Sequence, residues 1–230
     1  MSLLGKAALA MWWDMAPDMN TEFQDWHSHE HFRERLAIPG FKRATRWSSA
    51  DGGEGVFQIY EMDAHEVLSS PRYLAHLNTP SPWSRKMMPH HRNMVRSQCH
   101  VLESNGENVA RHALTIRLSP APKTDDTLRS SLKTIIDHLV EQPGCVGGHL
   151  LRHEAPAIAQ TTEQKIRGND QFADWVLLVI GYDLDVLKEL AASRLSASAL
   201  AQLGAQPGAF SGLYTLSFSA TAATIGLSAG

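Results

Sequence analysis

The same order of predicted elements occurs twice along this chain, and this repetition limits its fold more strongly than any single motif. Each half begins with a strand and an amphipathic helix, and a Pro-Gly pair ends the helix at Pro39-Gly40 and again at Pro143-Gly144. Proline disfavours helical geometry in the residue before it, so each pair marks the end of a helix. An internal repeat of this length predicts two tandem domains rather than a solenoid.

Each half has the order β-α-β-β-α-β, which is the order of the ferredoxin-like unit. In both halves an aspartate, Asp63 or Asp183, is placed to cap the second helix. The expected strands are 7–14, 41–47, 56–62 and 93–102 in the first half and 110–118, 145–153, 175–182 and 212–219 in the second. The expected helices are 21–38, 64–78, 125–141 and 183–203.

The repeat divides the chain into a ferredoxin-like domain at 1–104, which carries the candidate site, and a second at 105–230, which is expected to be structural. Helices are predicted on one face of each sheet only, so the two bare faces are expected to bury each other. The predicted fold class is therefore α+β, with tandem ferredoxin-like domains that form a pseudo-dimeric α/β barrel within one chain.

Alternation along the strand at 93–102 separates Val95 and Cys99 from Arg96, Gln98 and His100. The apolar residues are expected to face the helices, and the polar residues are expected to face the space between the two sheets. That space is consequently predicted to be polar enough to form a cavity.

Composition excludes several classes of function. Of the 230 residues 43% are apolar, which suits a globular chain with a core, and the net charge of −3 gives no reason to expect nucleic acid or a membrane as partner. The apolar start is too short to cross a bilayer, and the two cysteines fit reduced thiols in the cytoplasm. The expected location is the cytoplasm, and the expected partner is a small-molecule ligand. Exposed helices could still pair between copies of the chain, so a homo-oligomer is an alternative.

The helix at 21–38 combines aromatic, histidine and acidic residues. At about 100° per residue, Phe23, Trp26 and Glu30 fall on one side of this helix, and Phe32 falls on the opposite side. The side with Phe23 and Trp26 is expected to be buried together with Glu30 and His27. A buried carboxylate is unfavourable without a partner, which makes Glu30 the strongest indication of function in the sequence.

A stretch rich in proline, methionine and histidine lies at 79–91, between the predicted helix at 64–78 and the strand at 93–102. Such a segment can form a lid over a cavity. A solvated connector is the simpler interpretation, and it is the one expected here.

A further pattern links the first helix to the strand after it. It consists of a tryptophan, a Glu-His pair, Pro-Gly-Phe and an Arg-aromatic pair, here Trp26, Glu30-His31, Pro39-Gly40-Phe41 and Arg46-Trp47. In this respect residues 6–103 resemble the dimeric α/β-barrel superfamily, specifically its EthD-like, uncharacterised members. The resemblance implies the barrel fold. It leaves the chemistry open, because the superfamily includes cofactor-free monooxygenases, cyclases, isomerases and haem-dependent proteins. The second half resembles the fold only, so no site residue carries over to it.

Three residues of the first helix are candidate catalytic groups: Glu30, His31 and His27. A carboxylate in apolar surroundings has a raised pKa and histidine titrates near neutrality, so these groups could move a proton next to a carbonyl or orient a phenol. The alternative for Glu30 is a structural salt bridge to Arg43 or Arg46. His27 and His31 have the spacing of metal ligands, but no third ligand is evident in the sequence, so no metal site is expected.

Six residues are candidate ligand contacts. Aromatic side chains would form the walls of a site, and cationic side chains would hold an anionic group. The aromatic candidates are Trp12, Trp26 and Tyr60, and the cationic candidates are Arg46, Arg96 and His100. The alternative interpretations are core packing for the aromatic residues and ion pairs with acids of the other half for the cationic ones.

These observations favour an enzyme that needs no cofactor and uses acid–base chemistry on a small, partly aromatic organic substrate. Its site is expected between the helix and the sheet of the first half. Two alternatives stay open: a non-catalytic binding or scaffold protein of the same fold, and a haem- or metal-dependent oxidoreductase of the dimeric α/β-barrel type.

Overall fold

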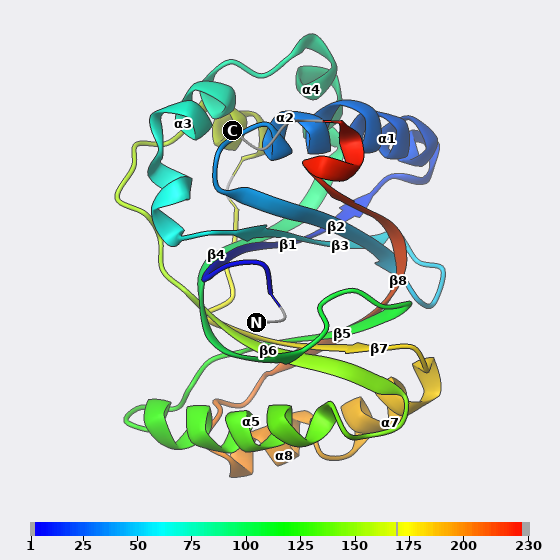
Figure 1. Ribbon diagram of the computed structural model, residues 1–230, viewed down its shortest axis with the longest axis vertical. Coiled ribbons are helices and arrows are strands. Elements are labelled where there is room, and N and C mark those ends of the chain that lie inside the picture. The colour runs from blue at the N-terminus through cyan, green and yellow to red at the C-terminus, as the bar shows by residue number, and fades with distance from the viewer. Residues whose placement is uncertain (1–2, 169, 227–230) are drawn as a thin grey trace.

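The computed structural model describes residues 3–168 and 170–226 as a closed, eight-stranded antiparallel barrel with helices outside it (Figure 1). The strands are β1 (Ala7–Met15), β2 (Phe41–Ser49), β3 (Gly55–Met62), β4 (His91–Gly106), β5 (His112–Leu118), β6 (Cys145–His153), β7 (Trp175–Gly181) and β8 (Phe210–Thr221). Their order around the barrel is β1-β3-β2-β8-β5-β7-β6-β4. The predicted α+β fold and its strands are confirmed, with β4 extending beyond both of its expected ends.

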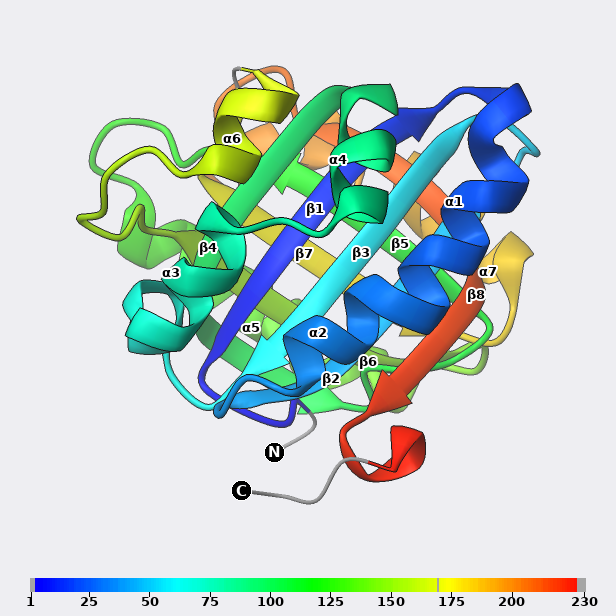
Figure 2. The same ribbon diagram turned by 90° about the horizontal axis from the view of Figure 1, so that it is seen from above.

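The helices form two layers on opposite sides of the barrel (Figures 1 and 2). The layer over the first half contains α1 (Asn20–Trp26), α2 (Phe32–Leu36), α3 (Pro71–Asn78) and α4 (Pro82–Met87). The layer over the second half contains α5 (Asp125–Leu139), α7 (Leu184–Ala192) and α8 (Ala197–Gln202). One helix of the second half, α6 (Thr162–Arg167), leaves its own layer and lies beside α3 and the 3-10 turn at Met88–His90 of the first half (Figure 2).

The barrel closes because the last strand of each half joins the sheet of the other half. β4 pairs with β1 of its own half and with β6 of the second half. In the same way, β8 pairs with β5 of its own half and with β2 of the first half. Every strand therefore has two neighbours, and the sheet has no open edge that could pair with another chain.

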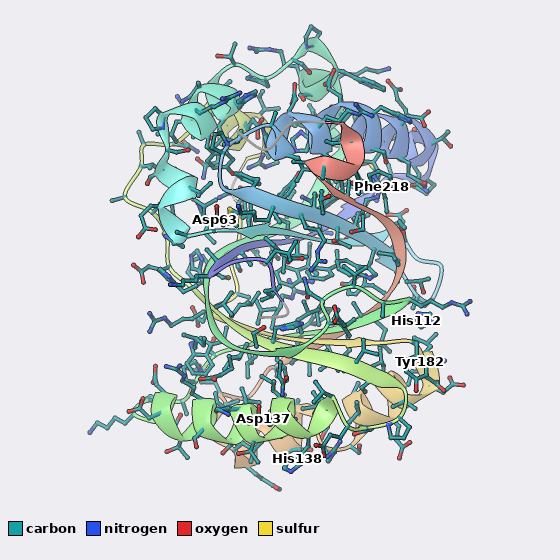
Figure 3. The ribbon with its side chains drawn as sticks, in the orientation of Figure 1. Asp63, His112, Asp137, His138, Tyr182 and Phe218 are labelled. Atoms are coloured by element: carbon teal, nitrogen blue, oxygen red, sulfur yellow. The ribbon has the colours of Figure 1, made fainter. Side chains whose placement is uncertain are left out.

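Apolar side chains fill the space between the two sheets (Figure 3). Trp12 stacks on Phe57 with ring centroids 5.2 Å apart, and Phe57 also stacks on Trp47 at 5.2 Å. Buried residues of both halves surround these rings, among them Ile59, Val95, Leu151, Val176, Leu178 and Ile180. The prediction of a polar cavity between the sheets is therefore wrong.

Arg96, Gln98 and His100 of β4 face outward, toward the helices, whereas Ser97 faces inward. In the register of β1 and β4, Val95 lies opposite Trp12 and Cys99 lies opposite Ala8, which places both β4 residues on the core side. Arg96 consequently lies on the helix side, so the observed orientation of this strand is the reverse of the predicted one. Alternation identifies which residues share a face, but it does not say which layer covers that face.

The helical segment at 20–36 contains one wide turn, His27–His31, between α1 and α2. There the backbone N–H of Phe32 donates to the carbonyl of His27, five residues earlier, so the turn holds one extra residue. The extra residue rotates the rest of the helix, and as a result Phe32 is fully buried whereas Glu30 is only half-buried. The predicted placement of these two residues is wrong for this reason.

The predicted cap at Asp63 is also wrong. Asp63 forms an ion pair with Lys42, and Ser70 caps α3 by accepting a hydrogen bond from a backbone N–H. The corresponding cap in the second half is confirmed, since the Asp183 carboxylate accepts from two backbone N–H groups of α7. The second helices of the two halves therefore begin differently, although the aspartates occupy matching places in the sequence.

Residues 79–91 are more ordered and more deeply buried than a solvated connector. They contain α4 and a short 3-10 turn at Met88–His90. The side chains of Met87 and Met88 are buried, and His91 begins β4 beneath them. The prediction of a solvated connector is therefore wrong.

We expect the two halves to unfold together, because they share the apolar core of the barrel. Phe57→Ala should lower the free energy of unfolding by about 3–5 kcal/mol, since Phe57 is fully buried between two tryptophans. Urea denaturation followed by tryptophan fluorescence and circular dichroism measures this, with Phe172→Ala as the control because Phe172 is 60% exposed. Two separate transitions, or equal effects of the two variants, would contradict a shared core.

Candidate functional site

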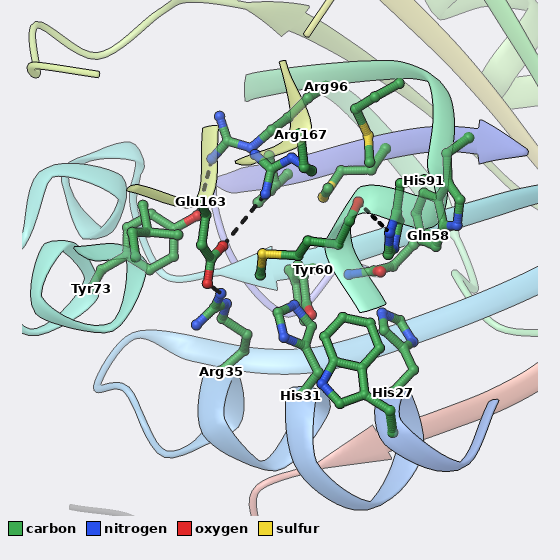
Figure 4. Close-up of a pocket in the computed structure, with 17 residues that line it drawn as sticks. His27, His31, Arg35, Gln58, Tyr60, Tyr73, His91, Arg96, Glu163 and Arg167 are labelled. Carbon is green, nitrogen blue, oxygen red and sulfur yellow. Dashed lines mark hydrogen bonds and ion pairs between the residues drawn. The ribbon is translucent and has the colours of Figure 1, made fainter. Parts of the chain in front are cut away.

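A small, partly open cavity lies between the sheet and the helical layer of the first half (Figure 4). Its volume is about 30 Å³, which is room for one or two water molecules. The barrel forms its floor through β1, β3 and β4, and the helical layer covers it with residues of α1, α2, α3, α6 and the wide turn. Both halves of the chain therefore contribute to the cavity.

Charged residues line one end of this cavity. Glu163 on α6 accepts a hydrogen bond from Arg35 at 2.5 Å and pairs with Arg167 at 3.5 Å. Burial disfavours the charged form of Arg35, but the Glu163 carboxylate outweighs it and raises the pKa of Arg35 above its ordinary value. A third guanidinium, that of Arg96 on β4, donates to the hydroxyl of Tyr73 at 3.0 Å. This end of the cavity carries more cations than anions.

Three histidines with lowered pKa line the other end: His27, His31 and His91. Burial lowers the pKa of His27 and His31 well below the usual range, and the charges of Arg46 and Arg35, respectively, lower it further. Burial also lowers the pKa of His91 to about 4, because its ring lies under a layer of aromatic side chains. All three rings are therefore neutral at pH 7.

Hydrogen bonds fix the tautomers of two of these rings. A guanidinium can only donate, so Nδ1 of His27, which lies 3.1 Å from Nη1 of Arg46, is an acceptor and the ring proton is on Nε2. Nδ1 of His91 lies 3.2 Å from the carbonyl oxygens of Met87 and Met88, so it carries the proton. Nε2 of the neutral His91 ring is then an acceptor.

Several buried polar atoms around the cavity find no hydrogen-bond partner within the described part of the chain. They are Nε1 of Trp13, Nδ1 of His31, Nη1 of Arg35, Nε2 of Gln58 and the hydroxyl oxygen of Tyr60. The Gln58 amide lies near enough to His27 and Tyr60 to influence the pKa of both, although its nitrogen completes no hydrogen bond of good geometry. Because buried polar groups are normally satisfied, these atoms indicate a place for a polar ligand or water.

The structure brings five of the sequence-predicted site residues to the cavity: His27, His31, Trp26, Tyr60 and Arg96. Glu30 does not line it. The Glu30 carboxylate instead accepts a hydrogen bond from the Trp26 indole at 3.2 Å and another from the Ser81 hydroxyl at 2.5 Å. These bonds fix the position of the Trp26 ring, which does line the cavity.

The alternative role predicted for Glu30, a salt bridge to Arg43 or Arg46, is wrong. Arg43 pairs with the buried carboxylate of Glu61 at 2.6 Å. Arg46 lies behind the cavity, where it donates to His27 and has its guanidinium 5.3 Å from the ring centre of Phe23.

Two further candidates lie away from the cavity. Trp12 is inside the barrel core, where its indole N–H donates to the Thr115 hydroxyl at 3.1 Å. His100 lies near the surface, where it stacks on His65 with ring centroids 4.3 Å apart and pairs with Glu154 at 3.4 Å. In this structure, neither of these two side chains can contact a ligand in the cavity.

The sequence analysis missed the residues that α6 contributes, Glu163 and Arg167. They belong to the polar stretch at 154–174, which replaces the short hairpin of the first half. The unusual length of that stretch was the available signal, but its destination on the other half could not be deduced from it. Arg35 was missed because a regular helix, at about 100° per residue, places it on the side opposite Trp26, and the wide turn brings it round to the cavity.

No three histidine, cysteine, aspartate or glutamate side chains among the described residues are grouped closely enough to hold a metal ion. The rings of His27 and His31 stack, with centroids 5.4 Å apart and planes 19° apart. Within the same residues, every helix is too short or too polar to cross a bilayer.

The three neutral histidines predict a dependence of stability on pH. Their pKa is about 6.5 in the unfolded chain and lower in the folded one, so the unfolded chain binds more protons in acid. The stability that they contribute is complete above pH 6.5 and falls below it, down to about pH 4 for His91. Each proton contributes a slope of about 1.4 kcal/mol per pH unit.

We therefore expect His31→Gln to flatten this slope in urea denaturation between pH 6.5 and 5. His138→Gln is the control, because His138 is exposed on the outer side of α5 (Figure 3). Equal slopes for the His31 variant and the wild type would show that His31 is not buried in its neutral form.

Comparison with solved structures agrees with this architecture. An anthrone oxidase-like protein superposes with a TM-score of 0.66 at 12% identity, over 96% of both chains. A candidate monooxygenase from Fusobacterium nucleatum superposes with a TM-score of 0.61 at 10% identity, over 95% of this chain and 96% of that one. One from Lactobacillus acidophilus superposes with a TM-score of 0.59 at 8% identity, over 94% and 96%. The sequence matches no family model and no curated protein. The chain has the dimeric α/β-barrel fold, closed within a single polypeptide.

Proposed function

We propose that this chain is an enzyme that works without a bound cofactor and moves a proton on a small, partly aromatic organic molecule in the cavity described above. The observation that carries the proposal is the set of neutral, buried histidines beside polar atoms that have no partner within the described residues. Neutral imidazoles can accept a proton, and aromatic walls suit a ring.

In this proposal His31 is the proton acceptor. Its Nδ1 has no hydrogen-bond partner among the residues described, and the nearest acidic oxygen, on Glu34, is 4.0 Å away. A lowered pKa makes His31 a weak base on its own. The anion that forms on the substrate beside it favours the protonated ring and offsets part of the cost of burial.

The other two predicted catalytic residues take supporting roles. Nδ1 of His27 is occupied by Arg46, so His27 acts as a donor through Nε2. Glu30 is a positioning residue, since its carboxylate holds the indole of Trp26 at 3.2 Å. The tilted contact of the Trp26 ring with the His31 ring, with centroids 4.6 Å apart, then orients the base.

The similarity to an anthrone oxidase-like protein supplies a test substrate. An anthrone has a C–H group between two aromatic rings whose proton is acidic, because the resulting anion is delocalised onto the ketone oxygen. After a base removes this proton, the anion can give electrons to dissolved dioxygen, and anthrone plus O₂ yields anthraquinone plus water. A ring system of this size needs more than 30 Å³, so α6 and its flanking segments would have to move aside.

A second candidate function is non-catalytic binding of such a molecule. The lowered pKa of the three histidines favours it, because groups that stay neutral in acid are weak bases. The two candidates differ in turnover rather than in affinity, so one experiment can separate them.

We expect the wild-type protein to accelerate oxygen consumption with anthrone, and His31→Gln to reduce that rate by about 10²–10⁴-fold. An oxygen electrode measures the rate, and His138→Gln serves as the control variant. Anthrone that quenches tryptophan fluorescence without turnover would favour the binding function. A rate that does not change in the His31 variant would rule out His31 as the base.

A further inference from the structure

Arg96 is a buried cation that forms no ion pair with any described residue. It is 6% exposed, and its guanidinium donates to the Tyr73 hydroxyl at 3.0 Å. The other two arginines of the cavity are neutralised, since Arg35 pairs with Glu163 at 2.5 Å and Arg167 pairs with Asp170 at 3.0 Å. A buried charge without a counter-ion is unfavourable, so the binding of one anion beside Arg96 would be electrostatically favourable.

Three of the unsatisfied polar atoms that line the same cavity as Arg96 are nitrogen donors. Nη1 of Arg35 and Nε1 of Trp13 are buried and lack partners within the described residues, and the amide nitrogen of Gln58 completes no good hydrogen bond. An anion that offers acceptor oxygens would satisfy these groups, whereas a cation or a hydrocarbon would not. A carboxylate has two such oxygens in a plane that matches the guanidinium fork.

The remaining walls favour an aromatic body on that anion. The rings of Trp13, Trp26, Tyr60 and Tyr73 all line the cavity, together with methionine and leucine side chains (Figure 4). Rings of this kind bury an aromatic ligand by stacking and edge contacts.

Arg96 also lines a second, open groove outside the cavity. This groove has a volume of about 360 Å³ and is bordered by Gln98, His153 and Phe172. The ring of Phe172 is 60% exposed and stacks on His153 with centroids 4.6 Å apart. Arg96 therefore lies between an open groove of ligand size and the small cavity.

Helix α6 lies along the same wall. Its residues Glu163 and Arg167 line the cavity, and its residue Gln164 lines the groove. A ligand that passes from the groove to the cavity has to displace this six-residue helix. The pairing of Glu163 with Arg35 holds the helix in place.

We propose that the ligand of this site is an aromatic monocarboxylate, which passes through the groove and binds with its carboxylate on Arg96. This inference rests on the proposed function for the location of the site and adds the chemical class of the substrate. Glu163 and Asp170 keep the other two guanidinium groups neutralised, so the site matches one negative charge rather than two.

Calorimetric titration of the purified protein with benzoate tests the inference, and benzamide is the uncharged analogue of the same shape. We expect benzoate to bind at least about tenfold more tightly than benzamide and than the dianion phthalate. Arg96→Gln should weaken benzoate binding about tenfold or more and leave benzamide binding unchanged. Arg96→Lys, which keeps the charge and loses the planar fork, should lie between Arg96→Gln and the wild type.

Arg117→Gln is the matched control, because Arg117 is a half-buried arginine that, like Arg96, has no ion pair among the described residues, and it borders a different groove. His31→Gln separates this inference from the proposed function: it should reduce oxygen consumption with anthrone by about 10²–10⁴-fold and leave the preference for benzoate over benzamide intact. Thermal melting confirms that each variant is folded. Equal affinity for benzoate and benzamide, no binding of benzoate, or unchanged affinity in the folded Arg96 variants would each overturn the inference.

Discussion

Closure of the barrel by exchange of strands is the constraint on which the rest of the structure depends. Each half places its last strand in the sheet of the other, β4 beside β6 and β8 beside β2. The inner faces of both sheets are thereby buried in one apolar core around Phe57. Because that core is largely apolar, Gln58 and Tyr60 of β3 and Arg96 of β4 lie on the outer face, under the helices. The position of the cavity is a consequence of this packing.

The cavity is also where the two copies of the repeat differ most. The second copy replaces a short hairpin with the stretch at 154–174, and α6 within it crosses to the first half. There it places Glu163 against Arg35, 128 residues away in sequence, with both side chains nearly fully buried. An ion pair of this kind adds little to stability on its own, but it fixes the position of two segments because breaking it leaves a buried charge. This ion pair therefore holds α6 in place over the cavity.

Burial determines the electrostatic character of the site. It holds His27 and His31 in the neutral form, while the arginines stay charged because their pKa is far higher. The result is a small space with neutral proton acceptors at one end and an excess of positive charge at the other. That combination suits a reaction in which the substrate becomes an anion, since the base and the stabilising charge lie on different sides of it.

The sequence by itself determined the order of elements, the duplication and the closed barrel, because these follow from local periodicity and from the need to bury one face of each sheet. It also identified His27, His31, Trp26, Tyr60 and Arg96, which the structure brings to one cavity. Tertiary structure decided which face of β4 meets the helices, because alternation is symmetric with respect to the two faces. It decided the roles of Glu30 and Arg35 as well, since the one extra residue in the turn at His27–His31 turns the first away from the cavity and the second toward it. The contribution of Glu163 and Arg167 depended on packing between distant segments, which no local pattern in the sequence encodes.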